Sequence, residues 1–266
     1  MLMLQQPKDS FSIKDSIKIF KLKIPSNTDI IVFGKGQELP AYTLKNALVS
    51  IKGNYIEISN IYDFLFLESP YTDISRILGF LGDENELHDL VSGMQALGIG
   101  GVIYFCGRTN YKPSTSIIEL RVLDIKLCEI NVSLSLLNTI SEDKNKREIS
   151  LIQQINDLSD LENWIKTKSR EFDLNLHLIL SPIMSPAKSF LERIGHNVST
   201  YFDKIILTDS QIITTGVDAY MMRRISSYLR ANGKNVKEVL LDTDPLMAPI
   251  YLSMILFYLK EVKEEV

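Results

Sequence analysis

Hydrophobic residues fall in short runs that alternate with longer amphipathic stretches along the whole chain. Residues 29–34 form a β-branched run that ends in glycine, which is typical of a buried strand. Residues 77–81 and 101–106 have the same character and predict two further core strands. Between these two runs, apolar residues recur at three- and four-residue spacing, which predicts a helix ending at Gly98. Those residues are Leu87, Leu90, Val91, Met94 and Leu97.

Other elements of the first part follow from the same patterns. We expect helices at about 40–51, 128–140 and 149–172, and strands at 55–58 and 117–122, the last at a sheet edge. The charged run 141–148 separates the second helix from the third. It is either a linker between domains or a solvated loop within one domain.

After this run the pattern starts again. The predicted order is a strand at 176–180, a helix at 187–194, a strand at 203–207, a helical stripe at 217–229, a strand at 236–241 and a last helix from about 245. Strands alternating with helices predict parallel sheets with right-handed crossovers. We therefore expect an α/β protein with two flavodoxin-like halves, 1–147 and 148–266, which repeat in pattern rather than in residue identity.

Composition narrows the function classes. A net charge of −4 argues against nucleic acid as the main partner. Cys106 and Cys128 lie in apolar contexts and are interpreted as buried thiols, rather than as a disulfide or metal site. The three histidines have no ligand spacing, so no zinc site is expected.

We expect no membrane association and a cytoplasmic location. Residues 1–6 lack the features of a secretory signal. The most apolar segment, 246–259, has 14 residues and is too short to cross a bilayer. It is predicted to be a buried helix.

Residues 76–87 give the most informative local pattern: a buried strand, a glycine turn and the start of a helix. In α/β proteins such a turn often holds an anion. Here Asp83 and Glu84 stand where a phosphate cradle would carry hydroxyls. They could bind a neutral sugar, an amino sugar or a metal; the preferred interpretation is that they complement the helix dipole.

The order and spacing of the elements carry a family resemblance, whereas the motif residues are only partly kept. The turn 34–36 reads Gly-Lys-Gly where the family has Gly-Thr-Ser, Gly82 keeps the pivotal glycine of a Ser-x-Ser-Gly-x-Thr motif, and Glu86 matches an acid common later in that motif. Ala-Leu-Gly at 96–98 matches a helix end. With this layout the chain resembles the double SIS (sugar isomerase) family, including the isomerase domain of glutamine–fructose-6-phosphate amidotransferase and the archaeal phosphoglucose/phosphomannose isomerases.

The resemblance implies a phosphorylated or amino sugar as ligand and a homodimer. No cofactor is expected. The chain departs from the family in two places. It lacks the serines and threonine of the phosphate motif, and it lacks the family's histidine at 214–218. Ser181 and Ser185 stand at the equivalent turn of the second half. The predicted ligand-binding residues are Gly34, Lys35, Gly36, Gly82, Asp83, Glu84, Ser181 and Ser185.

Isomerisation needs a ring-opening acid or base and a proton-shuttling carboxylate. Glu192 and His196, the latter donated by a neighbouring subunit, are the candidates for catalysis. Three hypotheses follow. The chain is a phosphosugar-binding protein diverged from an isomerase; or an active isomerase, with Glu192 or Glu84 as shuttle and His196 as ring opener; or a dimeric structural or regulatory module.

Overall fold

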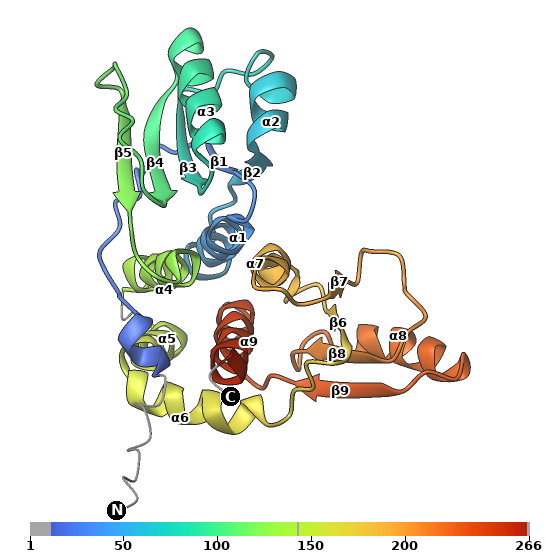
Figure 1. Cartoon of the computed structure of the whole chain (residues 1–266). Helices are drawn as coiled ribbons and strands as arrows, with labels where there is room; N and C mark the ends of the chain where they lie inside the picture. Colours follow the sequence, from blue (N-terminus) through green and yellow to red (C-terminus); the bar gives the residue numbers. More distant parts are fainter. Residues whose placement is uncertain (1–11, 143, 265–266) are drawn as a thin grey trace, which may run out of the picture.

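Two parallel β-sheets organise the chain. The computed structural model describes residues 12–142 and 144–264. The first sheet has the strand order β2-β1-β3-β4-β5 and the second the order β7-β6-β8-β9 (Figure 1). The predicted α/β fold with two parallel-sheet halves is confirmed. The strands are β1 (Ile30–Phe33), β2 (Glu57–Asn60), β3 (Arg76–Leu81), β4 (Gly100–Cys106), β5 (Ile118–Leu123), β6 (His177–Leu180), β7 (Val198–Thr200), β8 (Ser210–Thr214) and β9 (Val236–Leu240).

The two sheets change direction at equivalent places. The chain leaves β1 toward β2 on one side and returns to β3 on the other, and it leaves β6 toward β7 and returns to β8 in the same way. In open parallel sheets, the crevice at the carboxyl ends of such a strand pair is the usual ligand site. The fold therefore offers two equivalent crevices, β1/β3 and β6/β8.

Helices lie on both faces of each sheet. In Figure 1, α1, α4, α7 and α9 lie between the two sheets, whereas α3 covers the far face of the first sheet. The helices are α1 (Glu38–Ala47), α2 (Ile61–Asp63), α3 (Glu84–Leu97), α4 (Cys128–Ile140), α5 (Lys146–Asn156), α6 (Leu158–Ser169), α7 (Lys188–Arg193), α8 (Ala219–Ala231) and α9 (Ala248–Glu264), with short turns η1 (Ile13–Ser16), η2 (Leu48–Lys52), η3 (Phe64–Glu68) and η4 (Ser185–Ala187). None of these helices is long and apolar enough to cross a membrane.

One hydrophobic core joins the two halves. It runs from Ile31 in β1 through Leu134 in α4 and Ile255 in α9 to Leu180 in β6. Two smaller clusters fill the space beneath α3 and α8. The predicted boundary between residues 147 and 148 falls in the first turn of α5, and the division into halves at that point stays a prediction.

Two predicted elements need correction, and two strands were missed. Residues 203–207 do not form a strand. The Asp203 carboxylate accepts hydrogen bonds from the Thr200 N–H and hydroxyl, so the chain forms a local turn here instead of pairing with a neighbouring strand. The second sheet uses β7 and β8 instead, which carry polar residues and escaped the hydrophobic pattern. The single helix expected at 149–172 is two helices, because Asp157 caps α6 by accepting from the Asp160 N–H.

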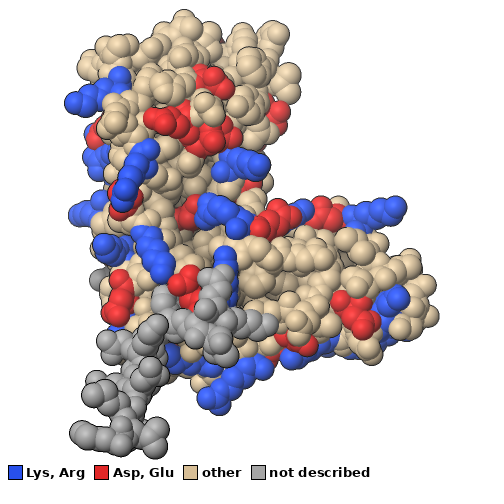
Figure 2. Space-filling view, in the orientation of Figure 1, with Lys and Arg blue, Asp and Glu red and all other residues tan. Residues whose placement is uncertain are grey.

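Charged side chains are mixed over the visible surface. On the face in Figure 2, Lys and Arg side chains lie interspersed with Asp and Glu side chains over both halves. A nucleic-acid interface needs a continuous basic surface. This face therefore shows none of the footprint expected for such a partner.

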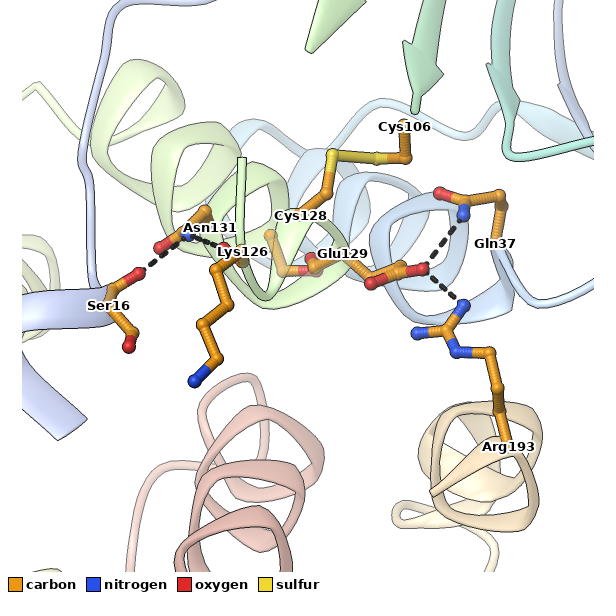
Figure 3. The surroundings of a disulfide bond; sticks show 9 residues. Ser16, Gln37, Cys106, Lys126, Cys128, Glu129, Asn131 and Arg193 are labelled. Atoms are coloured by element: carbon orange, nitrogen blue, oxygen red, sulfur yellow. Dashed lines mark hydrogen bonds and ion pairs between the residues drawn. A yellow bond between two sulfur atoms is a disulfide. The ribbon is translucent and has the colours of Figure 1, made fainter. Parts of the chain in front are cut away.

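The expectation of two free thiols is wrong, because Cys106 and Cys128 form a disulfide (Figure 3). Cys106 ends β4 and Cys128 begins α4, and the intervening β5 returns the chain so that the two Cα atoms lie 5.7 Å apart. The spacing of the two cysteines in the sequence does not indicate that they lie close together in the fold. The cytoplasmic location stays a prediction.

The disulfide should contribute measurable stability. It closes a loop with a sequence separation of 22 residues, for which loss of denatured-chain entropy gives about 3 kcal/mol. We expect the double variant Cys106→Ser/Cys128→Ser to unfold in guanidinium at a free energy lower by about this amount. A reducing agent should destabilise the wild type equally and leave the variant unchanged; equal stability of all samples would contradict the bond.

Candidate functional site

The crevice between β1 and β3 contains a carboxylate of the chain itself. The backbone N–H of Lys35, in the turn after β1, donates to both oxygens of Glu86 at 3.2 and 3.1 Å. A Cβ atom on Gly34 would lie 2.1 Å from Glu86 Oε2. Glycine at position 34 therefore leaves the room that this carboxylate occupies.

Glu86 reaches the crevice from the start of α3. Asp83 caps this helix by accepting hydrogen bonds from the N–H groups of Asn85 and Glu86. The Glu84 carboxylate accepts from the Thr109 hydroxyl at 2.6 Å. Both acids have structural partners at the helix start, and their predicted role in ligand binding stays a prediction.

Glu86 is an electrostatically costly residue. Glu86 is only 8% exposed to solvent. Burial raises the pKa of the Glu86 carboxyl above its ordinary value, the hydrogen bond from Lys35 N–H opposes that effect, and the nearby Asp83 and Glu38 add to it. The crevice thus contains a carboxylate whose charged form is disfavoured.

A second buried carboxylate lies beside the same turn. Glu129 Oε1 accepts from Gln37 Nε2 at 3.1 Å and from Arg193 Nη1 (Figure 3). Gln37 and Glu129 are 1% and 5% exposed. Among the hydrogen bonds of the described residues, Gln37 Oε1 has no partner. The ion pair links α4 of the first half to α7 of the second.

The glycines predicted to bind the ligand surround this cluster. A Cβ on Gly82 would lie 2.8 Å from Gln37 Nε2, and one on Gly36 would lie 3.4 Å from Arg193 Nη1. Gly36 also has a φ of +81°, which favours glycine. The structure therefore brings Gly34, Gly36 and Gly82 together, around protein side chains.

The second crevice, between β6 and β8, repeats the arrangement. Asp218 accepts from the Thr215 N–H at 2.8 Å and from its hydroxyl at 2.9 Å, and its other oxygen accepts from the Ile183 N–H at 3.2 Å. Ile183 lies three residues after the end of β6, and Lys35 lies two residues after the end of β1. In both halves, a carboxylate from the chain after the neighbouring strand accepts from a backbone N–H of the first turn.

The two predicted serines differ in environment. Ser181 is fully buried, and its hydroxyl has no hydrogen-bond partner among the described residues. The Ser185 hydroxyl donates to the Pro182 carbonyl at 2.8 Å, and no side-chain cap bond forms at η4. Ser185 does line a cavity between the halves.

That cavity has a volume of about 800 Å³ and lies where the turn after β6 faces α1. We name it the inter-half cavity. Its lining includes apolar, aromatic, hydroxyl and amide groups from both halves, among them Tyr42, Asn46, Ser50, Tyr55, Ser185 and Phe202. Such a mixture of rings with a few polar groups is typical of small-molecule sites.

Two cations line the inter-half cavity. Arg147 donates to both oxygens of Asp244, at 2.8 and 2.9 Å, and is neutralised by that pair. Lys45 lies over the Tyr55 ring, 5.7 Å from its centroid. In the described part of the chain Lys45 has no ion pair, so its charge is available to an anion.

The catalytic candidates lie apart from this cavity. Glu192 is on α7, with a side chain half exposed and its carboxylate 4.0 Å from Lys188 Nζ. His196 follows α7, and its Nε2 lies 3.4 Å from the Leu256 carbonyl oxygen in α9. Neither residue lines the inter-half cavity. Their roles in catalysis stay predictions.

Sequence reasoning missed Gln37, Lys45, Glu129 and Arg193. Glu129 carried a signal that could have found it, because it is the one charged residue in α4, among apolar and small residues. Such an acid is buried only with a partner. The partner, Arg193, is 64 residues away and could not be identified from the sequence.

The comparisons with known proteins concern the fold. The chain has a TM-score of 0.65 and 13% identity to glucosamine-6-phosphate deaminase from Thermotoga maritima, over 90% of this chain and 87% of that one. For tagatose-6-phosphate ketose/aldose isomerase from Escherichia coli the TM-score is 0.60 at 10% identity, over 90% and 83%. For the C-terminal domain of glucosamine-fructose-6-phosphate aminotransferase from Francisella tularensis it is 0.55 at 11% identity, over 88% and 83%.

The chain shares its fold with these solved structures. No family model and no curated protein sequence matches the chain. The two crevices lie where ligands of open parallel-sheet proteins commonly bind. Across residues 12–142 and 144–264, no group of three or more His, Cys, Asp or Glu side chains could hold a metal ion.

The raised pKa of Glu86 gives a pH-dependence opposite to that of most carboxylates. Because the folded-state pKa lies above the ordinary 4.5, the native state takes up this proton before the unfolded state does as the pH falls. We expect the unfolding free energy of the wild type, relative to Glu86→Gln, to rise as the pH falls from neutrality toward 4.5. Urea titrations at several pH values measure this difference; a constant or falling difference would refute the assignment.

Proposed function

We propose that the chain binds a phosphorylated sugar in the inter-half cavity and has lost isomerase activity. The observation that carries this proposal is Lys45, a cation without an ion pair in the described structure, in a cavity on a phosphosugar-isomerase fold. The proteins with similar structures include ones named for deamination or isomerisation of sugar phosphates. The proposed ligand class is the one that the names of these proteins contain, a sugar phosphate.

The chemistry of the cavity supports a sugar phosphate. A lysine ammonium binds phosphate as a point charge. Asn46, Ser50 and Ser185 supply amide and hydroxyl groups that can exchange hydrogen bonds with sugar hydroxyls. Tyr42 and Phe202 supply ring surface against which the apolar face of a sugar ring can pack.

The two crevices support the loss of ordinary phosphosugar chemistry. A phosphate in the β1/β3 crevice has to displace Glu86 from the Lys35 N–H, because the two anions would repel each other. The same holds for Asp218 in the β6/β8 crevice. The inter-half cavity avoids both carboxylates and keeps its cation.

Lys45 gives the binding test. We expect titration calorimetry to detect binding of fructose 6-phosphate, glucosamine 6-phosphate or glucose 6-phosphate, and Lys45→Ala to weaken the affinity by about tenfold or more, since a phosphate contact is removed. Lys112→Ala, a matched change at an exposed lysine outside the cavity, should leave the affinity unaltered.

Two outcomes would contradict the proposal. One is the absence of heat with all three sugar phosphates at millimolar concentration. The other is binding that Lys45→Ala leaves intact, which would place the ligand elsewhere, for example at the Gly34–Gly36 turn. Gly34→Ala would then test that turn, because its Cβ clashes with Glu86.

The loss of catalysis has its own test. In coupled assays for aldose–ketose isomerisation we expect no turnover above background, because neither Glu192 nor His196 lines the inter-half cavity. Turnover that is abolished by both Glu192→Gln and His196→Ala would instead support the active isomerase. The homodimer implied by the family resemblance stays a prediction, which light scattering can check.

A further inference from the structure

A second cavity lies against α6 and α9, and its lining residues differ from those of the inter-half cavity. Its volume is about 360 Å³, within the range of roughly 300–1,000 Å³ of small-molecule sites. We name it the α6/α9 cavity. What we infer for this cavity does not rest on the proposed phosphosugar function.

Aromatic and apolar side chains form its wall. Trp164 of α6 and Tyr251 of α9 have ring centroids 5.2 Å apart and are tilted by 48°. Leu161 is buried beside them, and Tyr251 is only 5% exposed. Two aromatic rings therefore lie in the wall of the cavity, and the faces of such rings attract cations.

The polar lining has one sign of charge. Asp157, Asp160 and Asp242 line the cavity, and Lys and Arg are absent from its lining. In the part of the chain that the structure describes, none of the three carboxylates has an ion pair. The nearby Asp244 differs, because Arg147 already neutralises it.

Surface acids explain the carboxylates and core packing explains the rings, but an organic cation could use both in the same hollow. Like charges focused in a cleft raise the local concentration of counter-ions. The aromatic faces add an attraction for cations that carry apolar groups, which a hydrated metal ion lacks. Gln153, Gln154 and Thr243 complete the rim with acceptors for hydroxyl or N–H donors.

We propose that the α6/α9 cavity binds a small organic ammonium ion. The positive head lies toward Asp160 and Asp242, and its carbon atoms pack against Trp164 and Tyr251. Asp157 also caps α6, so its carboxylate is oriented by the Asp160 N–H. The ligand class is thus set by charge together with apolar surface.

The chain contains a single tryptophan, Trp164, so its fluorescence reports on this cavity alone. The probe is choline, and the control ligand is 3,3-dimethylbutan-1-ol, which has the same shape with carbon in place of the charged nitrogen. We expect a saturable change of Trp164 emission with choline at millimolar concentration and none with the alcohol. Added sodium chloride should weaken the response, because it screens the exposed carboxylates.

Variants locate the charge. Asp160→Asn with Asp242→Asn should weaken choline binding by about tenfold or more, since two attractive charges are lost. Asp73→Asn, at an exposed acid outside the cavity, should leave binding unchanged. Circular dichroism confirms that each variant is folded.

Three results would overturn the proposal: no saturable response to choline, equal responses to choline and the alcohol, or unchanged choline affinity in the double aspartate variant. Sugar-phosphate binding that depends on Lys45 can persist in each case, so this failure is distinguishable from failure of the proposed function.

Discussion

Backbone N–H groups at the carboxyl ends of parallel strands need acceptors, and much of this structure depends on how that requirement is met. At equivalent turns in the two halves, a carboxylate of the chain accepts the hydrogen bond: Glu86 from Lys35 and Asp218 from Ile183. Most anion-binding α/β proteins leave such groups for a ligand. Here the fold satisfies them internally. Both turns are therefore satisfied without a ligand.

The centre of the molecule is held by contacts between distant segments. Glu129 joins Gln37 and Arg193 across the two halves, and the adjacent Cys128 is tied to Cys106 at the end of β4. Leu127, just before them, adopts a left-handed conformation with a φ of 53°. A non-glycine residue is held in that region only by its surroundings. The Glu129–Arg193 ion pair and the shared core around α9 connect the two halves, whereas the disulfide holds α4 to β4 within the first half.

The two proposed sites divide by charge. The inter-half cavity presents Lys45 with hydroxyl and amide groups, which suits an anion bearing hydroxyls. The α6/α9 cavity presents three aspartates with two rings, which suits a cation with apolar substituents. Because the two cavities carry opposite charge, the proposed ligands differ in class. Binding of one ligand therefore tests only one of the two proposed sites.

The sequence by itself determined the fold class, because hydrophobic period and glycine turns are local properties. It predicted α4 at its observed bounds and β3 within one residue, and it marked Gly34, Gly36 and Gly82 as turns of special geometry. It missed β7 and β8, whose polar residues hide the strand pattern, and the break at Asp157. Only the tertiary structure decided that the two cysteines are joined, that Glu129 meets Arg193, and that the glycine turns enclose carboxylates. Those outcomes depend on distances between residues far apart in the chain, which crossovers and helix packing set and no local pattern encodes.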